Sequence, residues 1–381
     1  MLTRGFVWKK IKEFVICGLL ITLAGCTMLE KPQFTELLWP PPPLTSRVKF
    51  VGLLFNEEDL GKTGGELFVD ALIGRKADRL SLQTPMVLAP SHDAKRLYIS
   101  DYAKRAVLVF DFDARRVSPL ESAAHPFKRP FGLAVDGQGN LYVADSDQKL
   151  IRVFDSKGKF LRDITHQSLE RPTGLAIDPN RRRLYVADSS WRTSENHFIY
   201  VFDLDGTYLK RFGGRGIEEG KLYFPTYIAV DGTSNVYVTD TLNARVQAFD
   251  AEGKFLKTFG EPGNKFGMFD KPKGVALDTF GNVYVVDSTW SNVQIFNQKG
   301  QVLLYFAGRG RIPGLLFNPT GIAVDKENRI YVADAFNGRV AIYELINTRA
   351  EDSFLAIPSE PAKGGDATKK KEELKEAKAT K

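Results

Sequence analysis

The stretch Arg171–Asp188, RPTGLAIDPNRRRLYVAD, contains two aspartates, Asp178 and Asp188, ten residues apart at the ends of two apolar runs. Paired carboxylates serve general acid–base catalysis and bind hard cations. The pair recurs at a spacing of nine residues in four further segments: Asp136/Asp145, Asp231/Asp240, Asp278/Asp287 and Asp325/Asp334. A sixth segment keeps only the second member, Asp101. Whether these carboxylates form a site depends on the elements that carry them.

The aspartates lie in copies of one sequence repeat. Six copies, about 47 residues apart, begin at Pro85, Pro130, Pro172, Pro225, Pro272 and Pro319. Each copy has three strand-like runs between turn residues and then a fourth, such as Lys159–Ile164 or Lys254–Phe259. The second run, such as Leu141–Ala144, is apolar without alternation, which indicates a strand covered on both faces. Four strands per repeat of about 45 residues is typical of propellers, so the sequence predicts an all-β, six-bladed β-propeller.

The repeat also has a characteristic motif. It reads P-x-G-[LIV]-A-[VIL]-D, then [LIV]-Y-V-[AVT]-D, then N-x-R-V, and it resembles the NHL repeat. The full Asn-x-Arg-Val element stands at Asn243–Val246 and Asn337–Val340, whereas copies two, three and five depart from it. The spacers Phe259–Pro272 and Phe306–Pro319 fit the resemblance, which covers residues 85–344. It implies a ring of six NHL-type blades.

Closure of the ring requires one blade of mixed origin. The last copy ends after its third strand, Val340–Tyr343. Arg47–Leu54, RVKFVGLL, has the pattern of the missing fourth strand and would join the two ends of the ring, which removes the open edges. The competing candidate is Ser353–Ile357, and we favour the N-terminal strand.

This architecture separates the paired aspartates. The first ends strand a of its repeat and the second ends strand b, and the two strands form an antiparallel hairpin. Their ends therefore point to opposite faces of the disk, roughly 15 Å apart for a five-residue strand. Two carboxylates at that distance cannot share a proton or an ion, and we expect each to accept hydrogen bonds from turn N–H groups.

Other catalytic patterns lack the context they require. The glycine clusters Gly213–Gly216 and Gly308–Arg311 lead into strands rather than helices, so they predict loops between blades and not phosphate sites. No G-x-S-x-G elbow is present. No strand expected to line the channel contains one of the four histidines, which are His92, His125, His166 and His197. We therefore predict no catalytic residue, no metal site and no cofactor.

The face that carries the loops between strands b and c and between strands d and a is the candidate binding face. Its side chains vary between copies while the strands do not, as expected for recognition on a rigid scaffold. Trp and Arg are frequent interface anchors, although the arginines can instead pair locally with the strand-end aspartates. The candidate residues are Tyr102, Lys104, Arg105, Lys149, Trp191, Arg192, Arg245, Trp290, Phe336 and Arg339.

Two insertions point to the same face. The loop Ser189–His197 of the third copy is longer than its equivalents. The connection Asn56–Thr84 is long for a compact domain. Within it, Glu66–Arg75 has the pattern of a short amphipathic helix, and we expect this helix to cap the channel mouth.

The N-terminus indicates export. A basic segment precedes the apolar run Phe14–Ala24, which is too short to span a bilayer, and LAGC ends at Cys26 as in a bacterial lipobox. Without residues 1–25, which carry four basic residues and one acidic residue, the formal charge falls from +7 to +4, so charge does not argue for nucleic acid. The only other cysteine, Cys17, lies within the signal. Thr27, rather than Asp, after the lipidated cysteine favours the outer membrane.

The predicted organisation has four parts: a lipoprotein signal peptide (1–25), a Pro-rich tether (26–46), the propeller (47–346, including the connection 56–84) and a charged, disordered tail (347–381). We expect a lipid-anchored envelope module that binds a protein, peptide or glycan and is not an enzyme. The alternative is a metal-dependent lactonase- or lyase-like enzyme at the channel mouth. Fold alone does not decide between them.

Overall fold

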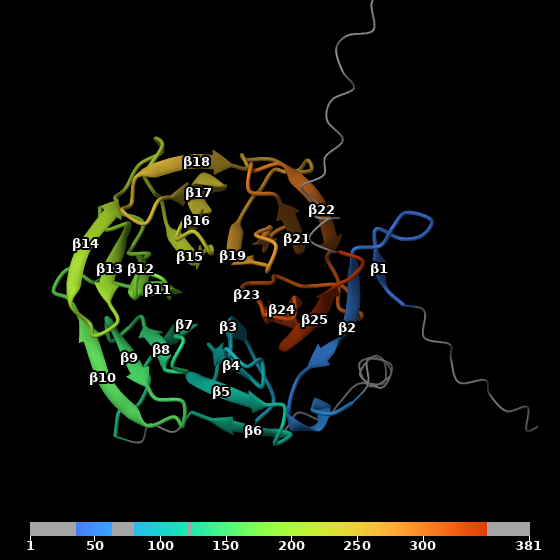
Figure 1. Ribbon diagram of the computed structural model, residues 1–381, viewed down its shortest axis with the longest axis horizontal. Helices are drawn as coiled ribbons and strands as arrows, with labels where there is room; N and C mark the ends of the chain where they lie inside the picture. The colour runs from blue at the N-terminus through green and yellow to red at the C-terminus, as the bar shows by residue number, and fades with distance from the viewer. Residues whose placement is uncertain (1–35, 63–79, 121–123, 349–381) are drawn as a thin grey trace, which may run out of the picture. The chain divides into compact units, whose positions relative to one another are not determined.

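The computed structural model describes residues 36–62, 80–120 and 124–348. From Leu37 onward the described residues form six antiparallel sheets, the blades, arranged as a ring around a central axis (Figure 1). In blades one to five, four strands follow in chain order from the innermost, strand a, to the outermost, strand d. This confirms the predicted six-bladed β-propeller.

The strand boundaries agree closely with the repeats. Blade one contains β3 (Pro85–Pro90), β4 (Arg96–Asp101), β5 (Ala106–Asp111) and β6 (Arg116–Pro119). Blade two contains β7 (Pro130–Val135), β8 (Leu141–Asp145), β9 (Leu150–Phe154) and β10 (Phe160–Thr165). Blade three contains β11 (Pro172–Asp178), β12 (Arg183–Asp188), β13 (Phe198–Asp203) and β14 (Tyr208–Gly213). Blade four contains β15 (Pro225–Val230), β16 (Val236–Asp240), β17 (Arg245–Phe249) and β18 (Phe255–Phe259). Blade five contains β19 (Pro272–Leu277), β20 (Val283–Asp287), β21 (Asn292–Phe296) and β22 (Val302–Ala307).

Blade six is built from two distant parts of the chain. Its inner strands are β23 (Ile322–Val324), β24 (Arg329–Asp334) and β25 (Arg339–Leu345). Its outer strand is β2 (Val48–Leu54), which pairs with β25 from Val48 opposite Leu345 to Leu54 opposite Val340. The predicted closure by an N-terminal strand is therefore confirmed. The competing segment 353–357 lies outside the described residues.

The end of the predicted tether is part of the propeller. Strand β1 (Leu38–Trp39) pairs with β2 as a fifth strand of blade six. The ring of Trp39 lies against Phe306 and Tyr343, with centroids 6.1 and 5.8 Å away. Residues 37–39 thus belong to blade six rather than to a spacer, because their apolar side chains find a partner surface there, whereas residues 41–45 are exposed. Residues 26–35 lie outside the described part.

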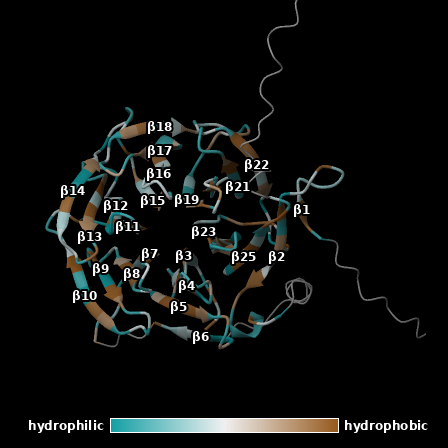
Figure 2. Ribbon diagram, viewed as in Figure 1, coloured by the Kyte–Doolittle hydropathy of each residue, from teal (hydrophilic) through white to brown (hydrophobic). Residues whose placement is uncertain are grey.

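The core lies between blades rather than within one layer. All five residues of β8, β16 and β20 are buried, as the continuous apolar runs predicted. The outer strands are half exposed, and their burial alternates in β10 and β18. Hydrophobic residues fall mainly in the strands and hydrophilic residues mainly in the loops (Figure 2). Each blade is therefore covered on both sides by its neighbours.

The glycine of the P-x-G motif allows the inner strands to approach each other closely. A Cβ on Gly132 would stand 2.1 Å from the carbonyl oxygen of Thr173 in the next blade. A Cβ on Gly174 would stand 2.5 Å from that of Thr226. Because both neighbours are backbone atoms, only glycine fits without a shift of the blades.

Helical structure is scarce in the described residues, where only the 3-10 turns η1 (Glu57–Asp59), η2 (Thr241–Asn243) and η3 (Ala335–Asn337) occur. None of these is long or apolar enough to cross a membrane. The helix predicted over residues 66–75 lies outside the described residues, as does the tail from residue 349.

Candidate functional site

The aspartates that end the b strands hold the incoming loops. Asp188 accepts hydrogen bonds from the backbone N–H groups of Glu170 and Arg171 at 2.7 and 2.9 Å. Each of its five equivalents accepts at least one such bond from the loop that enters its blade: Asp101, Asp145, Asp240, Asp287 and Asp334. The predicted structural role is confirmed, because these carboxylates satisfy N–H groups that no strand partner reaches.

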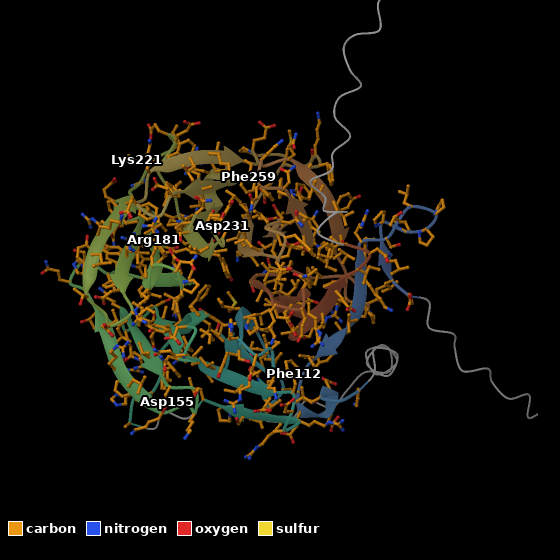
Figure 3. The ribbon with its side chains drawn as sticks, viewed as in Figure 1. Phe112, Asp155, Arg181, Lys221, Asp231 and Phe259 are labelled. Carbon is orange, nitrogen blue, oxygen red and sulfur yellow. The ribbon has the colours of Figure 1, made fainter. Side chains whose placement is uncertain are left out.

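The aspartates that follow the a strands hold the opposite turns. Asp231 accepts from the N–H groups of Thr233 and Asn235 at 2.9 and 2.8 Å and from the Tyr237 hydroxyl at 3.3 Å. In Figure 3 Asp231 lies well inside the ring. In blade three the register places Asp178 opposite Arg183, while Asp188 stands opposite Pro172 at the other end of the hairpin. The paired carboxylates thus belong to opposite faces and form no common site.

We call the face formed by the b–c and d–a loops the loop face, and the face formed by the a–b and c–d turns the turn face. Eight of the ten candidate residues are exposed or half-buried on the loop face: Tyr102, Lys104, Arg105, Lys149, Trp191, Arg192, Trp290 and Phe336. Trp191 and Phe336 are the most exposed aromatic residues among them, at 67% and 62%. The structure therefore places these side chains on one surface, although at separate blades of the ring.

Arg245 and Arg339 differ from the predicted surface role. Arg245 Nε donates to Asp240 Oδ2 at 2.8 Å, and Arg339 Nε donates to Asp334 Oδ2. The side chain of Arg339 is 3% exposed. Both arginines are structural, because their guanidinium groups balance buried carboxylates and bind loop carbonyls.

Three exposed apolar residues of the loop face were not predicted. Ile217, Phe266 and Ile312 lie in the loops that connect blades three to four, four to five and five to six, and they are 73%, 52% and 60% exposed. Each of these loops also contains a fully buried apolar residue, Leu222, Phe269 or Leu316, so the sequence alone does not show which apolar residue of the loop is exposed.

Arginines hold several aromatic rings of this face. Arg171 lies over the Trp191 ring at 5.5 Å, and Arg129 lies over the Tyr102 ring at 5.4 Å. Arg129 is also paired with Asp147 at 3.1 Å. Cation–π contacts of this kind restrict the rings before any partner binds.

The long loop of blade three is held by hydrogen bonds to residues that flank it. Glu170 accepts from the hydroxyls of Ser190 and Ser194, and Asn196 donates to Asp188. Burial raises the pKa of Asp188 to about 6. His197 is fully buried, its two ring nitrogens have no hydrogen-bond partner, and burial lowers its pKa.

His197 and His166 pack against different aromatic rings. Its ring lies edge-on to Tyr223 at 5.4 Å, while His166 stacks on Tyr208 at 4.3 Å. Within residues 36–62, 80–120 and 124–348, no three His, Cys, Asp or Glu side chains come together as metal ligands.

The channel is crossed by one side chain. Tyr227 of blade four stands where four other blades have the motif glycine, and it is 5% exposed. Its hydroxyl donates to the carbonyl oxygen of Met86 in blade one at 3.1 Å. The ring of Phe131 lies 6.3 Å from it. The channel is thus filled at this level by a side chain with a satisfied polar group.

Two family models match the sequence. The NHL repeat model matches residues 318–343, which contain β23, β24 and most of β25. The protein is a six-bladed β-propeller that contains an NHL repeat in blade six. The model of the SMP-30/gluconolactonase/LRE-like region matches residues 70–190 of this propeller.

Sequence relatives cover parts of the propeller. A gluconolactonase of Zymomonas mobilis is 26% identical over 164 residues, which is 38% of this chain and 46% of the relative. The B-box type zinc finger protein ncl-1 of Caenorhabditis elegans is 36% identical over 121 residues, 32% of this chain and 14% of the relative. The matches therefore span less than half of either relative.

Solved structures share the fold. A gluconolactonase from Xanthomonas campestris has a TM-score of 0.54 at 19% identity, and the match covers 69% of this chain and 86% of the other. A streptogramin B lyase has a TM-score of 0.53 at 14% identity, with 69% and 94% covered. An auxiliary nutrient binding protein from Bacteroides thetaiotaomicron has a TM-score of 0.55 at 14% identity, with 69% of each chain covered. At these identities the likeness concerns the propeller fold.

Proposed function

We propose that this propeller is a non-enzymatic binding module of the bacterial envelope, anchored through Cys26, which holds a protein or peptide partner on its loop face. The argument rests on the uneven distribution of exposed apolar side chains. Of the thirteen large exposed hydrophobic residues in the described part, seven lie on the loop face: Tyr102, Trp191, Ile217, Phe266, Trp290, Ile312 and Phe336. These residues stand at separate blades, so the proposal concerns a broad interaction surface on one face and not a single compact apolar patch.

The turn face offers a direct contrast. Within the described ranges, its a–b and c–d turns supply none of these thirteen residues. The other six lie on outer strands or in the β1–β2 connection: Leu44, Leu161, Tyr208, Leu209, Leu256 and Tyr305. Because both faces belong to the same repeats, a general excess of apolar residues does not explain the difference.

Site-specific photocrosslinking tests the binding role. A photoreactive amino acid replaces Phe336 on the loop face or Lys326 on the turn face, and both positions are exposed and belong to blade six. We expect a defined crosslinked species in cells from position 336 and none from position 326. Equal crosslinking from both positions, or none from either, contradicts the proposal.

The anchor has its own test. Labelling with a radioactive or clickable fatty acid should mark the wild-type chain and fail to mark the Cys26→Ala variant. Equal labelling of both chains would show that Cys26 is not the lipidated residue.

A second candidate function is lactone hydrolysis or lyase chemistry, and the family match over residues 70–190 favours it. Its test is hydrolysis of glucono-1,5-lactone by the full chain, assayed with and without added divalent cations. Turnover above the spontaneous rate in either assay would support this candidate against the binding module.

A further inference from the structure

A pocket of about 410 Å³ opens at the outer margin of the loop face in blade five. One wall is the loop that enters the blade and the other is formed by the ends of β21 and β22. Its lining residues are Asn264, Lys265, Phe266, Met268, Trp290, Asn292, Gln294, Tyr305, Ala307 and Gly308. The equivalent region in the neighbouring blades shows what is missing here.

In blade four this region holds the guanidinium of Arg245. Besides its bond to Asp240, the Nη2 atom of Arg245 donates to the carbonyl oxygens of Glu218 and Lys221 at 2.8 and 3.0 Å. These two carbonyls lie 27 and 24 residues before the arginine. The guanidinium thereby ties the strand to the loop.

Blade six repeats the arrangement with the same spacing. The Nη2 atom of Arg339 donates to the carbonyl oxygens of Ile312 and Leu315 at 3.2 and 2.9 Å. These carbonyls again lie 27 and 24 residues before the arginine. The two blades thus define one guanidinium site formed by the same backbone atoms.

Blade five keeps the backbone of this site but lacks the arginine. Asn292 occupies the position of Arg245 and Arg339. Its side chain is shorter than that of arginine, and the space that remains is the pocket. The residues 27 and 24 positions earlier are Lys265 and Met268, and both line the pocket. The loop therefore presents the carbonyl pair that a guanidinium binds elsewhere in this chain.

The loop geometry is preserved by a different residue. In blade four, Asn243 Nδ2 donates to the carbonyl oxygen of Gly216 at 2.9 Å. In blade five, Trp290 Nε1 donates to the carbonyl oxygen of Gly263, the equivalent atom, at 3.1 Å. The indole thus replaces the motif asparagine in holding the loop and adds a ring at the pocket.

The carbonyl pair retains acceptor capacity. The oxygen of Lys265 accepts from the Met268 N–H at 2.9 Å, and that of Met268 accepts from Gln294 Nε2 at 2.8 Å. In blade four the corresponding carbonyl oxygens, those of Glu218 and Lys221, accept the equivalent hydrogen bonds and in addition accept one each from the Arg245 guanidinium. Because a carbonyl oxygen has two lone pairs, each oxygen in blade five can accept one more donor.

The remaining walls also suit a planar cation. Trp290, Phe266 and Tyr305 line the pocket and are 40%, 52% and 53% exposed, so ring surface is available for cation–π contact. The buried Oδ1 of Asn292 has no hydrogen-bond partner, so this amide can rotate to serve a donor without losing a bond. The ammonium of Lys265 would repel a cation bound in the pocket. Because Lys265 is exposed, water and salt screen this repulsion.

The b strand of blade five ends in a buried carboxylate, Asp287. Asp287 is the equivalent of Asp240 and Asp334, which are each paired with an arginine. Among the described residues its hydrogen-bond partners are backbone N–H groups only: those of Asp270, Lys271, Thr289 and Trp290. This buried carboxylate lacks the arginine that Asp240 and Asp334 have, and among the described residues Asp145 and Asp188 lack one as well.

We propose that the blade-five pocket binds the arginine side chain of a protein or peptide partner, whose guanidinium takes the place that Arg245 and Arg339 occupy in their own blades. This inference rests on the proposed binding function and names its chemistry. A partner arginine would bind the two loop carbonyls and lie against the aromatic rings, so that the partner completes the motif that blade five lacks.

The test fills the pocket with the residue that the other blades use. Asn292→Arg, combined with Trp290→Asn, gives blade five the same two motif residues that blades four and six contain, and circular dichroism checks that each variant is folded. The probes are blocked single residues: N-acetyl-arginine methylamide, the same derivative of lysine, and that of citrulline, a neutral analogue of arginine. Binding to the full chain is followed by NMR through the indole N–H signals and by titration calorimetry.

We expect the arginine probe to bind the wild type and the Trp290→Asn single variant measurably, and to lose at least about tenfold in affinity with Asn292→Arg. Citrulline should bind at least about tenfold more weakly than arginine, because it lacks the charge. Unchanged arginine binding in Asn292→Arg, equal binding of citrulline, or stronger binding of lysine would each overturn the inference. So would a failure of the wild type to bind the arginine probe.

The photocrosslinking experiment separates this inference from the binding function itself. If position 336 still captures its partner equally well in the Asn292→Arg variant, the arginine pocket is wrong and the binding module stands. If capture falls in Asn292→Arg and the arginine probe is also lost, both are supported.

Discussion

The hydroxyl of Tyr227 and the carbonyl oxygen of Met86 are joined by a 3.1 Å hydrogen bond that connects blade four to blade one, which stand opposite each other in the ring. Neighbouring inner strands contact each other around the ring, but this bond crosses it. Burial raises the pKa of Tyr227, so the phenol remains a donor at all physiological pH values.

Replacing Tyr227 with Phe removes this donor and keeps the ring. We expect the free energy of unfolding to fall by about 1 kcal/mol, since Met86 keeps a bond from the Thr320 hydroxyl and is not left unsatisfied. Urea denaturation followed by circular dichroism measures the change. Tyr305→Phe, at an exposed position, is the control and should leave stability unchanged.

Gly132→Ala tests the close approach of neighbouring blades. The new Cβ would meet the Thr173 carbonyl at 2.1 Å, so we expect a loss of about 1–3 kcal/mol in the free energy of unfolding. Gly137→Ala in the same blade adds a Cβ with nothing within 4 Å. It should change stability by less than about 0.5 kcal/mol, and an equal loss in both variants would contradict the steric argument.

Asp188 predicts a specific pH dependence of stability. Burial raises its pKa in the folded state to about 6, above the ordinary value of 3.8, so the folded state binds the proton more tightly than the unfolded state. Its contribution therefore makes the protein less stable as pH rises from about 4 to 6. His197 acts in the opposite direction, because burial lowers its pKa and charging it at acidic pH favours unfolding.

The Asp188→Asn variant isolates the aspartate, because His197 is present in both proteins. We expect the stability difference between wild type and variant to shift in favour of the variant between pH 4 and pH 6.5. Denaturant unfolding at several pH values in this window provides the measurement. A difference that does not change with pH would show that Asp188 titrates normally.

Much of the fold could be predicted from the sequence because the repeats are regular. The proline starts, the continuous apolar b strands and the terminal aspartates each recur at one spacing, and each has a local physical cause. The closing strand was predictable for the same reason, since one blade lacked its fourth strand and Arg47–Leu54 has the matching pattern.

The site was less predictable because it depends on what each position touches. Arg245 and Arg192 look alike in sequence, yet one is paired with a buried carboxylate and the other is exposed. The pocket of blade five arises from an absent side chain, and only the contacts of Arg245 and Arg339 reveal which atoms were left without it. The Pro-rich segment was misjudged because its composition does not show that Trp39 has a surface to pack on.

The role of the Pro-rich segment can be tested with two residues of the same segment. Trp39 packs against Tyr343 and Phe306, whereas Leu44 is 64% exposed. We expect Trp39→Ala to cost about 2–3 kcal/mol of stability, less than a fully buried tryptophan, and Leu44→Ala to cost less than about 0.5 kcal/mol. Equal effects would indicate that the segment is a spacer after all.

The pairing of Val48 with Leu345 has a consequence for how the chain folds. Blades one to five each consist of consecutive strands and can form in order as the chain is synthesised, whereas β2 must wait for β25, which is made nearly three hundred residues later. Contacts so distant in sequence slow folding, and the unpaired strands of blade six remain open to wrong partners until the ring closes. The pairing of β2 with β25 is therefore the folding step before which this propeller is most prone to aggregate.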